Sequence, residues 1–145
     1  MEAKCFLSRA YKLHREIQIK KEQLASIRES LSNITKPIDK EHVSHTPDSS
    51  PMENALISLI ELENEVQNDA ARFVEIQKET VRVINQLADP TLRLLLSKRY
   101  VCFKTWQVIA NEINLSEKRV FNQHNCGLKR VEEILDSMEI SDQSD

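Results

Sequence analysis

Lysine, arginine and asparagine side chains are concentrated in the segment SEKRVFNQHN, in the last third of the chain. Lysine and arginine bind phosphate oxygens, and arginine and asparagine also donate hydrogen bonds to base edges in the major groove of DNA. Ser116 is a good N-cap, so a helix is predicted to begin at Glu117 and to present these side chains on its first turns. The candidate DNA-binding residues of this segment are Ser116, Lys118, Arg119, Asn122 and, secondarily, Asn125.

The charge of the chain is uneven, and the basic surplus lies around this segment. The net charge is −3, yet residues 90–135 hold eight basic and four acidic residues. A local basic surplus attracts an anionic partner, although a solvated helical surface can carry the same charge. Lys98, Lys104 and Lys129 are the lysines predicted to contact phosphates.

Two helices joined by a tight turn would position these side chains. The spacing of apolar residues in TWQVIANEINLSEKRVFNQ predicts one helix over residues 105–113, a turn at 114–115 and a second helix over 117–136. The inner positions are Ile109, Ala110, Leu115 and Val120, followed by Gln123 or His124, Gly127 and Val131. Trp106 and Phe103 are expected to close this core. A preceding helix over residues 90–101 is predicted, since an aspartate caps it and a proline suits its first turn.

Composition predicts an all-α protein. The 145 residues include one glycine and four prolines, and good helix formers dominate. No apolar run approaches the roughly 20 residues that span a bilayer, and the N-terminus lacks the apolar core of a secretory signal. We therefore expect a cytoplasmic protein without a membrane partner. Its three cysteines are expected to stay reduced, with Cys5 and Cys102 serving as small apolar residues.

Two long heptad patterns precede the basic segment. They cover residues 2–34 and 52–88, and they predict an antiparallel helical hairpin across residues 1–88. The proline- and serine-containing segment between them, residues 36–51, is predicted to be a flexible loop. Further apolar residues of the second helix lie off its seam, which indicates another partner, either a second copy of the chain or the C-terminal domain.

One charged residue occupies each heptad seam. In a pair of antiparallel helices, the residue numbers of facing residues add up to a constant. Leu13 and Ile76 give a sum of 89. Lys20 and Asp69 also sum to 89, so they are predicted to form an ion pair that fixes the register of the hairpin. The alternative is that both side chains reach water at the edge of the hairpin.

No catalytic, cofactor or metal site is predicted, and we expect the protein not to be an enzyme. His124 and Cys126 lie two apart on a predicted helix and therefore point about 200° apart, too far for a nucleophile and its base. His42 and His45 have ligand spacing but lack a second pair of ligands. A chain with one glycine contains no glycine-rich phosphate loop.

The C-terminal segment resembles region 4 of bacterial sigma-70-type factors. The matching positions are Pro90, Leu95, Arg99, Tyr100, Thr105, Ile109, Ala110, Leu115, Ser116, Val120, Leu128, Lys129 and Val131. The stretch NQLADPTLRLLLSKRYVCFKTWQVIA, residues 85–110, is also similar to the pattern EQLxDPxxRxxLxxRYxxxxTWxxIA. That pattern belongs to small sigma-like proteins of phages and prophages, which carry a long N-terminal helix pair. The resemblance implies a hairpin and a helix-turn-helix domain, which here covers residues 89–137. The acidic residues 138–145 that follow are predicted to be a disordered tail.

The resemblance implies a sequence-specific regulator of phage or prophage transcription that binds double-stranded DNA in the bacterial host cell. Two other functions stay open. The first alternative is a non-catalytic module that docks on RNA polymerase or another protein, and the position of Phe121 on the groove-facing side favours it. The second alternative is a small-terminase-like protein of DNA packaging. The sequence also leaves open whether host RNA polymerase is contacted and whether the hairpin forms a homodimer.

Overall fold

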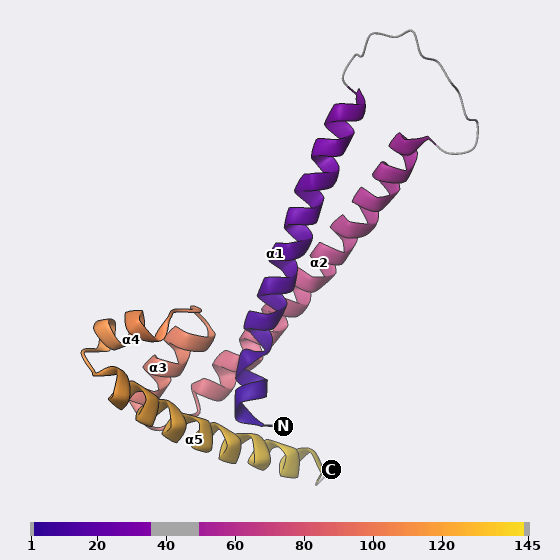
Figure 1. The fold of residues 1–145 in the computed structure, drawn as a ribbon. Coiled ribbons are helices and arrows are strands. Elements are labelled where there is room, and N and C mark those ends of the chain that lie inside the picture. Colours follow the sequence, from indigo (N-terminus) through magenta and orange to yellow (C-terminus); the bar gives the residue numbers. More distant parts are fainter. Residues whose placement is uncertain (1, 36–49, 144–145) are drawn as a thin grey trace. The chain divides into compact units, whose positions relative to one another are not determined.

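The computed structural model describes residues 2–35 and 50–143, which form five helices (Figure 1). They are α1 (Ala3–Thr35), α2 (Pro51–Ile84), α3 (Pro90–Tyr100), α4 (Trp106–Ile113) and α5 (Glu117–Gln143). No strand occurs in these described ranges, so the predicted all-α fold is confirmed. The predicted flexible loop, with His42 and His45, lies outside the described residues up to residue 49.

Two helix ends differ from the sequence prediction. Helix α2 ends at Ile84 rather than at residue 88, and the guanidinium of Arg93 donates to the carbonyls of Leu87 (2.6 Å) and Ala88 (3.3 Å) beyond that end. These bonds satisfy carbonyls that a continuing helix would otherwise bond internally. The sequence predicts a disordered tail over 138–145, whereas residues 138–143 belong to α5, because neither glycine nor proline interrupts the helix there.

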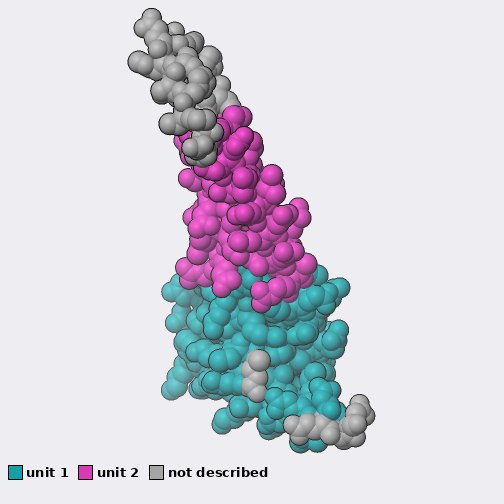
Figure 2. All heavy atoms as spheres, turned by 90° about the vertical axis from the view of Figure 1, so that its right-hand side faces the viewer, with its two compact units in different colours: residues 1–14, 73–145 teal, residues 15–72 magenta. Residues whose placement is uncertain are grey.

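The chain divides into two compact units, and both α1 and α2 contribute to each of them (Figure 2). Unit 1 comprises residues 1–14 and 73–145, and unit 2 comprises residues 15–72. This division differs from the predicted boundary after residue 88. Assignment of residues 1–88 to one hairpin domain and of 89–137 to another stays a prediction.

Unit 2 contains a stretch of α1 beside an antiparallel stretch of α2. Ile17 and Leu24 are buried on the α1 side. On α2 the apolar seam residues of this unit are half-buried, whereas Asp69 is buried. Lys20 Nζ lies 2.6 Å from Asp69 Oδ2, so the structure contains the direct contact that the index sum predicts. A role of that contact in fixing the register stays a prediction.

Unit 1 has one continuous hydrophobic core, to which all five helices contribute. Its fully buried side chains come from every part of the unit, and they include Leu7, Ile84, Leu95, Ile109 and Val131, each with no exposed area (0%). Burying a side chain of this kind stabilises a fold by about 1.5–3 kcal/mol. The first turns of α1 and the last turns of α2 are therefore part of the same core that positions α4 and α5.

Gly127 lies where α5 packs against α3. A Cβ atom added to Gly127 would be 3.3 Å from Leu96 Cδ1, and the Leu96 side chain is fully buried. We expect Gly127→Ala to change the free energy of unfolding by less than about 1 kcal/mol, because the gain in helix propensity is offset by the tight contact. Gly127→Leu is expected to destabilise the protein by about 1–3 kcal/mol through overpacking. Urea unfolding measures both, and equal stability of the Leu variant and the wild type would contradict the close approach.

Candidate functional site

The candidate DNA-binding residues form the exposed face of the first half of α5. Lys118, Arg119, Asn122 and Asn125 are exposed, whereas the opposite face of α5 is buried in the core of unit 1. The Oγ atom of Ser116 accepts a hydrogen bond from the Arg119 amide at 3.2 Å, so Ser116 caps the helix as predicted. Within the described ranges, the four exposed side chains have no hydrogen-bond or ion-pair partner in the protein. Their donors are therefore free to bind a ligand.

The turn between α4 and α5 is built from local signals. Asn114 adopts the left-handed conformation (φ 57°, ψ 41°) that asparagine tolerates better than most residues, and its amide donates to the carbonyl of Ala110. The amide of Leu115 also donates to that carbonyl at 3.1 Å. At the other end of α4, Thr105 Oγ1 accepts from the Val108 amide at 3.3 Å. These bonds fix where α4 ends and where α5 begins.

Trp106 holds an aromatic cluster beside the exposed face of α5. The guanidinium carbon of Arg99 lies 4.4 Å from the centroid of the Trp106 ring, and the Phe121 ring centroid is 5.3 Å from it. Trp106 is partly buried and packs against the core, whereas Phe121 remains 46% exposed. The exposed ring of Phe121 therefore lies among the polar candidate residues, and it contacts Trp106, which packs against the core.

His124, not Gln123, continues the buried face of α5. Its ring is 6% exposed, its Nε2 atom lies 2.6 Å from the hydroxyl of Tyr100, and its ring centroid lies 4.6 Å from that of Trp106. Burial lowers the pKa of His124 to about 4, with smaller contributions from the positive charges of Arg99 and Lys4. The imidazole is therefore neutral at physiological pH, which suits a structural role in the core.

The lysines predicted to contact phosphates have different surroundings. Lys129 is exposed on α5. Lys98 and Lys104 both donate to the carboxylate of Glu112 on α4, the Lys104 bonds measuring 2.7 and 3.0 Å. The two ammonium groups, Lys104 first, hold the pKa of Glu112 below its usual value. Sequence reasoning missed this cluster, because Lys98 on α3 and Glu112 on α4 are separated by the segment that joins the two helices.

Phe103 lies elsewhere than predicted. Its ring belongs to an aromatic cluster with Tyr11 and His14 of α1 and Phe73 of α2, with centroid distances of 5.4, 5.2 and 6.3 Å. Its φ angle of 57° is rare for a bulky residue. The prediction that Phe103 closes the core between α4 and α5 is therefore wrong, because the left-handed backbone directs the ring toward α1 and α2.

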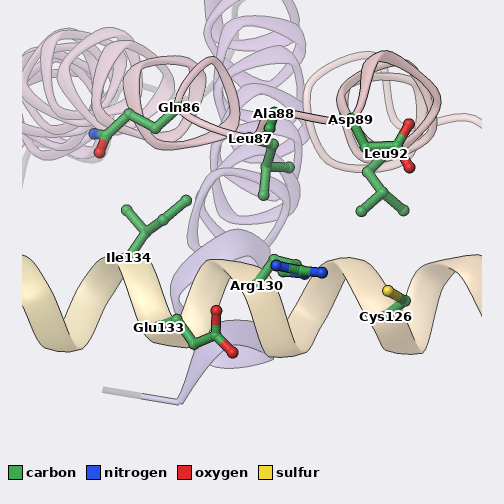
Figure 3. A pocket seen from close by; sticks show the side chains of 9 residues that line it. All are labelled: Gln86, Leu87, Ala88, Asp89, Leu92, Cys126, Arg130, Glu133 and Ile134. Carbon is green, nitrogen blue, oxygen red and sulfur yellow. The ribbon is translucent and has the colours of Figure 1, made fainter.

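A hollow of about 300 Å³ lies between α5 and the segment that joins α2 to α3 (Figure 3). Arg130, Cys126 and Ile134 of α5 form one side, and Leu87 and Leu92 form the other. The thiol of Cys126 is free. The lining combines apolar side chains with charged and polar groups, among them Arg130, Asp89, Glu133 and Gln86.

The three cysteines and the candidate metal ligands are also placed by the structure. All three cysteines are free and exposed, so Cys5 and Cys102, predicted to serve as small apolar residues, are not part of the buried core. In the described part of the chain, no cluster of three or more His, Cys, Asp or Glu side chains could hold a metal ion. None of the described helices combines the length and the apolar content needed to cross a membrane.

These features define an all-helical protein with an exposed basic and amide-rich helix face. The chain belongs to the family described as "Protein of unknown function (DUF1492)", whose match extends over residues 49–132, more than half of the chain. The matched residues include α2, α3, α4 and the exposed face of α5. No curated protein and no solved structure matches the chain.

Proposed function

We propose that this protein is a sequence-specific DNA-binding regulator of phage or prophage transcription, in which α5 enters the major groove. The observation that carries the proposal is the exposed face of α5, where Lys118, Arg119, Asn122 and Asn125 have free donors on a helix whose other face is buried. Arginine and asparagine are suited to base edges, and lysine to phosphates. The opposite face of α5 packs into the hydrophobic core, which fixes the direction in which these four side chains extend.

The resemblance of residues 85–110 to small sigma-like phage proteins supports the same function. Ser116 Oγ accepts the Arg119 amide and so defines the start of α5, and the positive end of the helix dipole at this terminus favours a nearby phosphate. Transcriptional control is proposed from this resemblance alone. DNA binding is proposed from the resemblance together with the geometry of α5.

The double variant Lys118→Ala/Arg119→Ala is expected to bind DNA about tenfold more weakly than the wild type, with a shallower dependence of affinity on salt. The change removes two cations from the face that we place in the groove. The ligand is first obtained by selecting bound fragments from host and phage genomic DNA at two salt concentrations. Fluorescence anisotropy then measures the affinity of each protein for a recovered duplex.

The matched control is Arg15→Ala/Lys21→Ala, which removes two exposed cations from α1 in unit 2. This control is expected to retain nearly the wild-type affinity. If the two double variants bind the recovered duplex equally well, α5 does not carry the contact.

The second candidate function is docking on RNA polymerase or another protein. Phe121, half-exposed beside Trp106, favours it, because exposed aromatic side chains are common at the centres of protein interfaces. Recovery of no DNA fragment by the folded wild-type protein would reject DNA binding and favour docking. A ring-sized oligomer in light scattering would instead favour the small-terminase-like alternative.

A further inference from the structure

Three charged side chains from neighbouring elements meet beside α4. Lys98 lies in the last turn of α3, Lys104 in the segment between α3 and α4, and Glu112 on α4. Lys104 Nζ donates to both oxygens of the Glu112 carboxylate, at 2.7 and 3.0 Å. Lys98 Nζ donates to Oε2 of the same group. Two cations thus share one anion, which leaves the cluster with a net positive charge.

The backbone holds the two lysines in place. The amide of Lys104 donates to the carbonyl of Lys98 at 3.0 Å, and the guanidinium of Arg99 donates to the carbonyl of Lys104 at 3.0 Å. Arg99 is itself fixed by its contact with the Trp106 ring. The local fold therefore fixes the backbone from which the two lysine side chains extend, and their ammonium groups meet on the carboxylate of Glu112.

The cluster is open to solvent. The side chains of Lys98, Lys104 and Glu112 are 21%, 35% and 33% exposed. An anion from solution can reach both ammonium groups without any change in the core. The Glu112 carboxylate has two oxygens that share one negative charge. A phosphodiester also has two such oxygens, so it can accept hydrogen bonds from the same two lysines.

We infer that Lys98 and Lys104 form a phosphate-binding site for the DNA backbone, and that Glu112 occupies this site in the free protein. The inference rests on the proposed function and deepens it, since it names the ligand group and an internal competitor. Binding of a phosphate replaces the Glu112 carboxylate on the two ammonium groups. Glu112 therefore weakens DNA binding, even though it lies among residues that favour it.

The charge of Glu112 persists at neutral pH. The hydrogen bonds from Lys104 and Lys98 lower the pKa of this carboxyl, so the competing group is ionised at neutral pH. Removal of its charge therefore requires a substitution.

The variant Glu112→Gln tests the inference. It is expected to bind the duplex recovered by genomic selection several-fold more tightly than the wild type, because a neutral amide no longer competes with phosphate. Urea unfolding of the variant checks that the fold is retained, as expected for an exposed ion pair.

Two controls separate this mechanism from a general effect of charge. Glu132→Gln makes the same change in net charge at an exposed position of α5 that lies outside the cluster, and it is expected to raise affinity less. Adding Lys98→Met and Lys104→Met to Glu112→Gln is expected to abolish the gain.

Each result has a definite meaning. A wild type that binds the duplex, with a Glu112→Gln variant that binds equally or more weakly, overturns the inference and leaves the proposed function intact. Equal gains from Glu112→Gln and Glu132→Gln also overturn it, because they show a non-specific effect of charge. If neither wild type nor variant binds any recovered DNA, the proposed function fails, and the inference fails with it.

Discussion

Lowering the pH from neutral to about 4 is expected to destabilise the protein by up to about 3 kcal/mol through His124 alone. The ring is buried between Tyr100 and Trp106, and burial is the main reason that its pKa is about 4 rather than the ordinary 6.5. A charged imidazole cannot regain in this position the hydration that it has in the unfolded chain.

Stability falls with falling pH because the unfolded chain binds a proton at His124 more readily than the folded protein does. Above pH 6.5 the ring is neutral in both states, and stability is at its full value. Between pH 6.5 and about 4 the unfolded chain binds a proton that the folded protein does not, so stability falls as the pH falls. Below about 4 both states are protonated, and this contribution stays constant.

Urea unfolding at a series of pH values measures this effect, and two variants assign it. His124→Gln keeps a partner for the Tyr100 hydroxyl but cannot titrate, so its stability is expected to lose this part of the pH dependence. Tyr100→Phe removes the hydrogen bond but leaves the ring buried, so most of the dependence is expected to remain. An identical pH profile for His124→Gln and the wild type would show that His124 does not cause it.

The local signals of the sequence located the elements around the candidate site. Thr105 and Ser116 are capping residues, and both accept the amide hydrogen bond that defines a helix start. Asn114 is a residue type that tolerates the left-handed turn that ends α4. These properties depend on residues within four positions of each other, so they can be predicted from a single sequence. The exposed positions of α5 follow from the same periodicity.

Contacts between distant segments were less accessible to sequence reasoning. The position of Phe103 depends on Tyr11 and Phe73, which are far from it in the chain. It also depends on a positive φ angle, which a phenylalanine in the sequence does not indicate. The pairing of Lys98 and Lys104 with Glu112 depends on how α3, α4 and the segment between them pack together. The contact between Lys20 and Asp69 could be predicted from the sum of their residue numbers. In two regular antiparallel helices that sum is the same for every pair of facing residues.

The contact between Lys20 and Asp69 is chemically asymmetric. Lys20 Nζ lies 2.6 Å from Asp69 Oδ2 and 3.7 Å from Glu65 Oε2, so the lysine has a second anionic neighbour. The lysine side chain is 27% exposed, whereas the Asp69 side chain is 11% exposed. The hydrogen bond to Asp69 is the largest cause that raises the pKa of Lys20, so the ammonium group stays charged up to high pH.

Lys20→Leu is therefore expected to destabilise the protein more than Asp69→Leu. The first change leaves a mostly buried carboxylate without its cation, and desolvation of such a group costs about 1–3 kcal/mol. The second change leaves a lysine that still lies near Glu65 and can extend toward water. The double variant Lys20→Leu/Asp69→Leu is expected to be at least as stable as the wild type, since apolar side chains replace an ion pair that adds little net stability.

Free energies of unfolding for the four proteins form a double-mutant cycle, and the denaturant dependence reports on register. If the ion pair excludes slipped alignments of α1 on α2, the double variant is expected to unfold less cooperatively, with a smaller denaturant dependence, although it is stable. A seam of leucine alone permits several alignments of similar energy, because each slip by one heptad again places apolar residues opposite each other. If both single variants and the double variant unfold with the wild-type cooperativity and stability, the pair has no part in fixing register, and the apolar seam alone is sufficient.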